Sequence, residues 1–359
     1  MGHIVVDISG HGFGHAAQVG PVLKAFVGAY PQTRLTIRAA IPDPILDQAL
    51  GIPFDRAPPA PEACMVMHGP TRLDVLGSIQ AYLQLHKDWD RLVDQEAARL
   101  AALAPDLLFA DAPYLTIIAA AVAGIPVCAL CSFGWDQILR PYAADFSEIG
   151  SIVDRITASY GMAKAFMRCE PALMDANLKN VMRIGPVGRT GVDRRRWLTE
   201  VAGIPDTERV VVVSFGGVAG GWNLHGLPEV PGVTWLLGHG RLPARRDVLS
   251  CPDLDLRFID AIASADAVFT KSGYGTFVEA AHHGARVLYI DRPDWAEATA
   301  LEGWIDSRGV ATRLMEQNLT TGRLADATTA TLAQPRREAI PYTGIDTAVA
   351  VLSETMLRE

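Results

Sequence analysis

The sequence has few cysteines and no long uninterrupted apolar segment. Only 5 of its 359 residues are cysteine, an odd number that is too small for a disulfide framework and is typical of a reducing compartment. The most apolar run, Leu115 to Leu130, contains Gly124 and Pro126 and is shorter than the roughly 20 residues that span a bilayer. The N-terminus also lacks a basic region followed by a long apolar one. We therefore expect no targeting segment and a cytoplasmic location.

The chain has fewer basic than acidic residues: 32 Lys and Arg and 40 Asp and Glu, which give a formal net charge of −8. This balance argues against general nucleic-acid binding. A peripheral contact with a membrane and the oligomeric state stay open. The chain is 49% hydrophobic and 20% charged, which excludes a disordered protein, and its length predicts two domains or one large one.

Apolar strands alternate with helical patterns in two series. The first has strands at 4–8, 35–40, 107–110 and 127–130 and helices at 16–30, 73–103 and 115–123. The second has strands at 209–214, 234–237, 266–270 and 287–290 and helices at 276–283 and 298–307. Nearly continuous apolar strands in this order predict an α/β fold whose parallel sheets are covered by helices on both faces.

The two series predict two domains, residues 1–190 and 191–340, joined by a linker within 183–206 that holds the basic run Arg194 to Arg196. Within residues 341–359 we expect a C-terminal helix, over 343–357, that packs back on the first domain. Ligands of such sheets bind at the carboxyl ends of the strands. The chemistry should therefore lie in the loops that follow the strands, on both sides of a shared cleft.

The segment Gly10-His11-Gly12-Phe13-Gly14-His15 follows the first strand and precedes a helix. The histidines interrupt a dinucleotide fingerprint, and no Gly-Lys-Ser/Thr follows as in a Walker A loop. A histidine at a helix N-terminus has its neutral form favoured, which suits a general base. The alternative is a glycine-rich turn with two half-exposed histidines.

Two glycine-rich strand ends in the second series indicate an anion site. Residues 271–279, Lys-Ser-Gly-Tyr-Gly-Thr-Phe-Val-Glu, join a strand to a helix N-terminus, where N–H groups and the helix dipole favour phosphate. Ser214-Phe215-Gly216-Gly217 forms a second such end, or only a tight turn. Thr276 and Glu279 also have the spacing of a capping box, so Glu279 has a purely structural alternative.

The segment 291–297 places Asp294 and Glu297 after another strand. Carboxylates at a strand end can bind sugar hydroxyls; the alternative is that this segment is only a solvated turn before a helix. Cys128 and Cys131 have the spacing of half a zinc site, but an odd spacing in a strand points them to opposite faces. We therefore expect no metal or redox site there.

Taken together, these segments resemble the two-domain GT-B glycosyltransferases. Within that superfamily the chain resembles the N-acetylglucosaminyltransferase of cell-wall lipid synthesis and the glycosyltransferase-like N-terminal half of plant arabinokinases. The segments that carry the resemblance are Ser9 to His15, Phe133-Gly134-Trp135-Asp136 and Lys271 to Glu279. It covers residues 4–150 and 205–305 and does not imply sugar-kinase activity.

The resemblance implies two facing Rossmann-like domains and transfer of a sugar from a nucleotide diphosphate-sugar, with a UDP-sugar as the expected donor, to an acceptor hydroxyl. The acceptor is a small molecule or lipid-linked. His15 would be the base, with His11, Gly12, Gly14 and Asp136 on the acceptor side. A nucleotide-sugar epimerase and a non-catalytic nucleotide-sugar-binding protein are the alternatives.

On the donor side, the resemblance assigns Phe258 and Ile259 to the nucleotide base and Glu279 to the ribose. The diphosphate would lie at Gly216, Gly217, Ser272, Gly273, Gly275 and Thr276. Asp294 and Glu297 lie in the region that binds the donor sugar. We expect no cofactor and a metal-independent reaction, in which the helix dipole takes the place of a metal ion.

Overall fold

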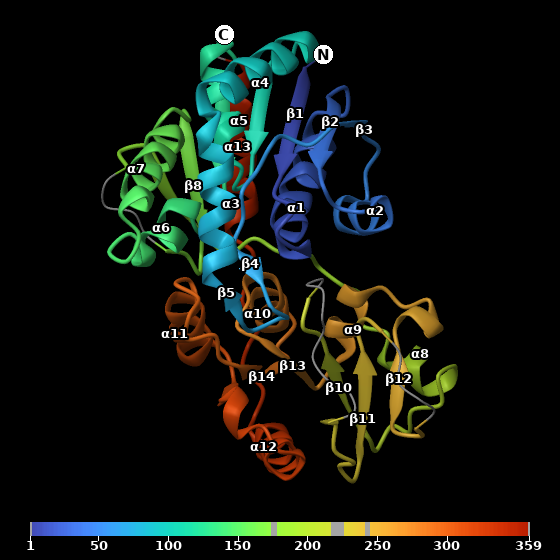
Figure 1. The fold of residues 1–359 in the computed structure, drawn as a ribbon. Coiled ribbons are helices and arrows are strands. Elements are labelled where there is room, and N and C mark those ends of the chain that lie inside the picture. Colours follow the sequence, from blue (N-terminus) through green and yellow to red (C-terminus); the bar gives the residue numbers. More distant parts are fainter. Residues whose placement is uncertain (1, 174–177, 217–225, 241–244, 358–359) are drawn as a thin grey trace.

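The chain forms two α/β halves, each built on a parallel sheet (Figure 1). The computed structural model describes residues 2–173, 178–216, 226–240 and 245–357. The first sheet has the order β3-β2-β1-β6-β7-β8-β9 and the second β12-β11-β10-β13-β14-β15. Each sheet runs parallel throughout, as continuous apolar strands predict.

The strands of the first sheet are β1 (His3–Ile8), β2 (Arg34–Ala39), β3 (Asp55–Ala57), β6 (Leu107–Ala110), β7 (Val127–Leu130), β8 (Ala165–Cys169) and β9 (Val181–Ile184). Those of the second are β10 (Arg209–Val213), β11 (Val233–Leu237), β12 (Val248–Ser250), β13 (Ala267–Lys271), β14 (Arg286–Ile290) and β15 (Ala311–Leu314). The short strands β4 (Val66–Met67) and β5 (Leu73–Asp74) form an antiparallel pair.

The helices of the first half are α1 (Phe13–Ala29), α2 (Asp43–Leu50), α3 (Val75–Lys87), α4 (Trp89–Leu103), α5 (Tyr114–Val122), α6 (Trp135–Leu139) and α7 (Ser147–Gly161). The later helices are α8 (Arg195–Glu200), α9 (Phe258–Ser264), α10 (Tyr274–His282), α11 (Ala298–Arg308), α12 (Thr321–Ala333) and α13 (Gly344–Leu357).

Three expectations from the sequence need correction. The helical stretch 73–103 is two helices preceded by a strand, because Asp88 leaves helical geometry and Asp74 caps α3 by accepting from the Gly77 N–H. The first helix begins at Phe13, since Gly12 has an extended backbone, and so His15 lies in its first turn. The linker segment 183–206 contains α8 and the end of β9.

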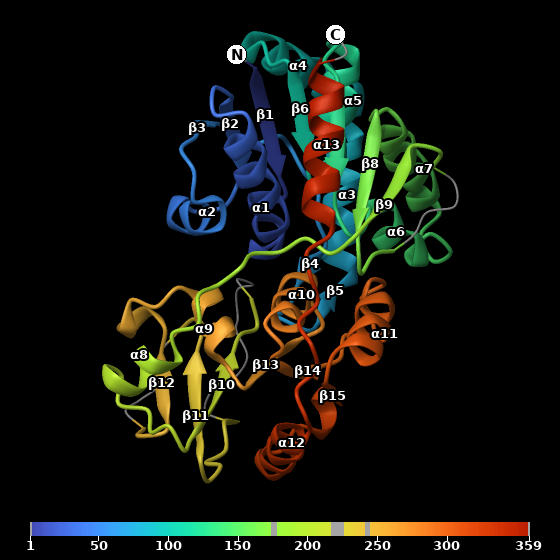
Figure 2. The same ribbon diagram turned by 180° about the vertical axis from the view of Figure 1, so that it is seen from behind.

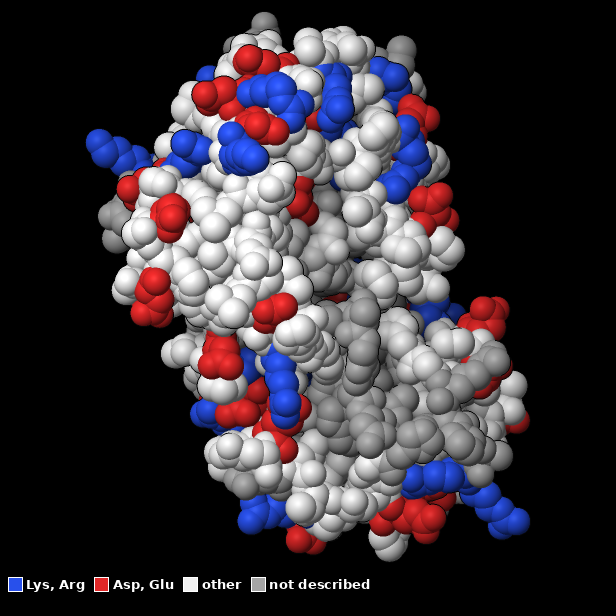
Figure 3. Space-filling view, viewed as in Figure 1, with Lys and Arg blue, Asp and Glu red and all other residues white. Residues whose placement is uncertain are grey.

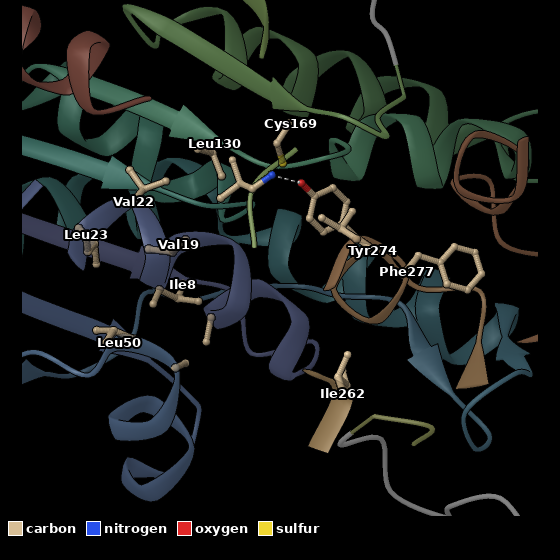
Figure 4. Close-up of a cluster of buried hydrophobic side chains, with 14 of the residues drawn as sticks. Ile8, Val19, Val22, Leu23, Leu50, Leu130, Cys169, Ile262, Tyr274 and Phe277 are labelled. Carbon is tan, nitrogen blue, oxygen red and sulfur yellow. Dashed lines mark hydrogen bonds between the residues drawn. The ribbon is translucent and has the colours of Figure 1, made fainter. Parts of the chain in front are cut away.

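One apolar cluster extends through both halves. It joins residues of α1 and β7, such as Val19 and Leu130, to Phe277 and Tyr274 of α10. The hydroxyl of Tyr274 accepts a hydrogen bond of 3.0 Å from the Val187 N–H, and Figure 4 shows this ring reaching toward Cys169 of the first sheet. The cluster therefore fixes α10 of the second half against the first half.

The chain crosses between the halves twice, and the two crossings touch. The Tyr342 hydroxyl donates to the Arg189 carbonyl at 2.8 Å, and the Gly344 N–H donates to the Pro186 carbonyl at 3.1 Å. The second crossing leads into α13, which packs on α1 and on β6 to β9, so that the first and last described elements, β1 and α13, both belong to the first half (Figure 2).

The surface carries both signs of charge. Figure 3 shows Lys and Arg intermingled with Asp and Glu over the described part of this face, on both halves. Within the described ranges, no helix has both the length and the apolar character that a membrane crossing requires.

The packing of α1 against α2 can be tested by substitution of Gly20. A Cβ atom there would lie 2.3 Å from the Ala49 carbonyl oxygen, so Gly20→Ala should lower the free energy of unfolding by about 1–3 kcal/mol, the usual cost of overpacking. Gly28→Ala, in the same helix and with nothing within 4 Å, is the matched control and should be neutral or stabilising. Urea unfolding measures both; equal stabilities would contradict this packing.

Candidate active site

A cleft lies between the two halves at the carboxyl ends of their strands. From the first half it is lined by His11, Gly12, Gly14, His15, Ser132 and Phe133. From the linker and the second half it is lined by Arg189, Ser214, Gly216, His239, Phe258, Lys271, Gly273, Gly275, Thr276, Glu279, Arg292, Trp295 and Glu297. The structure thus brings together most of the residues singled out from the sequence.

His15 forms a buried pair with Asp111, the residue that follows β6. Its Nδ1 lies 2.6 Å from Asp111 Oδ2, which also accepts a 3.2 Å hydrogen bond from the Ser9 N–H. A carboxylate beside Nδ1 favours the tautomer that carries its proton on Nδ1, and this leaves Nε2 as the basic atom of the imidazole. Burial alone would lower the pKa of His15, but the charges of Asp111, Glu62 and Glu297 outweigh it and raise this pKa.

Glu62 supports the glycine-rich loop from the irregular segment between β3 and β4. Its carboxylate accepts from the Gly10 N–H at 3.1 Å and from Trp135 Nε1 at 3.2 Å. Burial raises the pKa of Glu62. Neither Glu62 nor Asp111 is among the site residues predicted from the sequence. Asp111 had a signal, since it is an acidic residue directly after an apolar strand, whereas Glu62 lies in no recognisable pattern.

Aromatic rings from both halves meet at His11. Its ring stacks on Trp295 with 5.5 Å between centroids and meets Trp135 edge-on at 5.0 Å. Burial, together with the neighbouring His15, Arg292 and Lys271, holds the pKa of His11 well below its ordinary value. The neutral form of the His11 imidazole is therefore favoured, and its ring packs against those of Trp295 and Trp135.

Glu297 joins the halves through its carboxylate. Oε1 accepts from the Ser132 hydroxyl at 2.6 Å, and Oε2 accepts from Trp295 Nε1 at 3.1 Å. Gln18 donates to the same Ser132 oxygen at 3.3 Å. Burial raises the pKa of Glu297. Both of its oxygens are thus engaged within the protein.

The N-terminus of α10 opens on the cleft. Gly273 is the N-cap and provides no side chain, so the first N–H groups of the helix are left to a ligand. Because the helix begins at Tyr274, Thr276 lies inside the first turn and the capping box with Glu279 does not form. The Glu279 carboxylate instead accepts two hydrogen bonds from Arg189, at 2.6 and 3.0 Å.

Phe258 marks one end of the cleft. Its ring stacks on His239 with 5.6 Å between centroids, near the Arg189–Glu279 pair. Burial, with the charge of Arg189, lowers the pKa of His239. The adjacent Ile259 is buried and does not line the cleft.

Three other predicted site residues lie outside the cleft lining. The Ser272 hydroxyl donates to Glu302 at 2.6 Å, because strand alternation turns it away from its neighbours Lys271 and Gly273. Asp136 is fully buried and accepts from the Thr157 hydroxyl at 2.9 Å, while Asp294 is exposed to solvent. Gly217 lies outside the described residues.

One buried group among the described residues has the composition of a metal site. Ligand atoms of His15, Asp111 and Cys131 all lie within 4.8 Å of one another. Cys128 belongs to the apolar cluster on the other face of the sheet, as its spacing from Cys131 predicts. The sequence also contains two Asp-x-Asp triplets, Asp88-Trp89-Asp90 and Asp253-Leu254-Asp255, whose carboxylates are exposed and do not line the cleft.

Comparison with known proteins places the fold. No protein-family model matches the chain. The L-arabinokinase of Arabidopsis thaliana is 24% identical over 326 residues, which cover 88% of this chain and 31% of that protein. The chain therefore spans about a third of the length of this relative.

Solved glycosyltransferases share the fold along the whole chain. MurG of Acinetobacter baumannii superposes with a TM-score of 0.57 at 18% identity, covering 99% of this chain and 100% of MurG. CalG4, the calicheamicin glycosyltransferase, superposes with a TM-score of 0.60 at 16% identity, covering 100% of this chain and 94% of CalG4. Phytolacca americana UGT2, complexed with UDP-2fluoro-glucose and pterostilbene, superposes with a TM-score of 0.60 at 14% identity, covering 99% of this chain and 94% of UGT2. The expected fold of two facing Rossmann-like domains, that of the GT-B glycosyltransferases, is confirmed.

The His15–Asp111 pair can be tested by titration. Asp111→Asn removes the charge that opposes the effect of burial, so the pKa of His15 should fall and the imidazole should become neutral at a lower pH. NMR titration of the His15 ring measures the change, and Asp145→Asn, at an exposed site in the same half, is the control. An unchanged pKa of His15 in Asp111→Asn would contradict the pair.

Proposed function

We propose that this chain transfers a sugar from a nucleotide diphosphate-sugar to an acceptor hydroxyl. The observation that carries the proposal is His15, which is paired with the buried Asp111 and lines the same cleft as the N-terminus of α10. A base and an anion site on two sides of one cleft are the two parts that this reaction needs.

In the proposed reaction, Nε2 of His15 accepts the proton of the acceptor hydroxyl. The acceptor oxygen bonds to the anomeric carbon of the donor as the bond from that carbon to the phosphate oxygen breaks. Asp111 stabilises the imidazolium that forms. The departing diphosphate gains negative charge, which the N–H groups at Gly275 and Thr276 and the dipole of α10 stabilise.

For the donor we propose a uridine nucleotide. Phe258 and His239 provide ring surfaces at one end of the cleft, and the Arg189–Glu279 pair lies beside them. The carboxylate of Glu279 is held rigidly by Arg189 and retains lone pairs that can accept from ribose hydroxyls. The UDP-2fluoro-glucose in the solved complex of UGT2, which shares the fold, supports this choice.

The base assignment predicts a separation of binding from transfer. His15→Ala should keep UDP binding, because the nucleotide end of the cleft is intact, and should lose transfer by about 10²- to 10⁴-fold, the usual contribution of a general base. His68→Ala, at an exposed histidine outside the cleft lining, is the matched control. Calorimetry with UDP and a transfer assay give the two readouts.

Full activity of His15→Ala would contradict the assignment of the base. If the donor alone is converted into an isomer without an acceptor, the chain is instead a nucleotide-sugar epimerase. Binding of UDP-sugars with no turnover over a broad acceptor panel would indicate a non-catalytic nucleotide-sugar-binding protein.

We further propose that transfer needs no metal ion. A metal bound to Nδ1 of His15, with Asp111 and Cys131, would place the remaining imidazole proton on Nε2 and so remove the base. The N-terminus of α10 supplies the positive potential at the diphosphate instead. We therefore expect protein from which metal ions have been removed to transfer sugar at the same rate in the presence of EDTA as in the presence of added Mg²⁺. A rate that depends on Mg²⁺ would show this proposal to be wrong.

A further inference from the structure

Two basic residues of the cleft lining, Lys271 and Arg292, have no carboxylate partner in the described part of the chain. Lys271 ends β13 and Arg292 follows β14, and both side chains line the cleft. Arg292 is only 5% exposed. Its guanidinium lies 4.3 Å from the centre of the Trp295 ring and donates weakly to Met67 Sδ at 3.9 Å, while its buried Nε has no hydrogen-bond partner. Within the described ranges, no carboxylate oxygen lies within 4.0 Å of either cation.

The carboxylates that line the cleft are engaged elsewhere. Glu279 is paired with Arg189, and the two oxygens of Glu297 accept from Ser132 and Trp295. Burial lowers the pKa of Arg292 to about 10, and the charge of Glu297 opposes this only in part. Burial and the neighbouring Arg292 also hold the pKa of Lys271 well below its ordinary value. Because its pKa stays at about 10, Arg292 is charged near pH 7, and this part of the cleft carries a positive charge that no described carboxylate neutralises directly.

Arg292 follows β14, three strands away in the sheet from β11, which leads to His239 at the nucleotide end of the cleft. Its neighbours are Trp295, which stacks on His11, and Met67 of the first half. The nucleotide end is marked by Phe258 and the Arg189–Glu279 pair. A group bound to Arg292 would thus lie beside the histidine loop, where the sugar and the acceptor meet.

We infer that the substrates carry an anionic group in addition to the donor diphosphate, and that Arg292 binds it with the help of Lys271. This inference rests on the proposed function. A buried cation is costly unless it is paired, and the guanidinium fork matches a carboxylate or a phosphate. Two sources offer that chemistry: the carboxylate of a uronic acid sugar on the donor, or an acidic group on the acceptor.

Calorimetric titration of the whole chain with UDP, UDP-glucose and UDP-glucuronate tests the donor as the source. We expect UDP-glucuronate to bind about tenfold or more tightly than UDP-glucose, as one charged hydrogen-bonded pair allows. Arg292→Gln should abolish this preference and leave the affinity for UDP unchanged. Arg292→Lys should retain part of the preference.

Matched controls separate loss of the site from loss of the fold. Arg308→Gln makes the same change at an exposed arginine in the last turn of α11 and should keep the preference. Lys271→Met provides a second removal of charge, in case Arg292→Gln fails to fold. Far-UV circular dichroism and the melting temperature of each variant report whether the fold is intact.

The acceptor is tested with the UDP-saturated protein. If the two donors bind equally, glucose 1-phosphate should bind more tightly than glucose, and Arg292→Gln should remove that difference. No preference in either titration would overturn the inference. An Arg292→Gln variant that loses as much affinity for UDP as for its conjugates would also overturn it, because Arg292 would then contact the diphosphate. If UDP and both conjugates fail to bind, the proposed function fails first, which distinguishes the two failures.

Discussion

The cleft depends on the close approach of two helices, one from each half. A Cβ atom at Gly275 of α10 would lie 3.9 Å from the Cβ of Ala17 in α1, so larger side chains at either position would hold the helices apart. Tyr274, next to Gly275, anchors this contact in the core of the first half. Because both helices begin at the cleft, His15 and the N–H groups of α10 face the same space. The positive ends of two helix dipoles meet there, which favours an anionic ligand.

The fold was largely predictable from the sequence because its strands are buried on both faces and appear as uninterrupted apolar runs. The loops that follow β1 and β13 could be recognised for the same reason, as glycine-rich segments directly after such runs. The partners of the site residues could not be recognised. Asp111 meets His15 only because β6 lies beside β1 in the sheet, and Arg189 meets Glu279 only because the linker passes over α10.

Side-chain direction was the other property that the motifs did not determine. Lys271 and Gly273 line the cleft while Ser272, between them, turns to Glu302, because successive residues of an extended chain point to opposite sides. Asp136 belongs to a recognisable segment and is nevertheless buried under α7, where Thr157 accounts for one of its oxygens. A matched segment therefore locates a region of the fold, and the packing around it decides which of its atoms a ligand can touch.

The double crossing between the halves limits how the cleft can open. A single flexible connection would let the halves separate in any direction. Here the two crossings are hydrogen-bonded to each other through Tyr342 and Gly344, and α13 is packed along the first sheet beyond them. Stretching one crossing would strain the other, so the two connections restrict relative movement of the halves more than a single connection could. The hydrogen bond from Ser132 to Glu297 adds a further link between the halves, in the wall of the cleft itself.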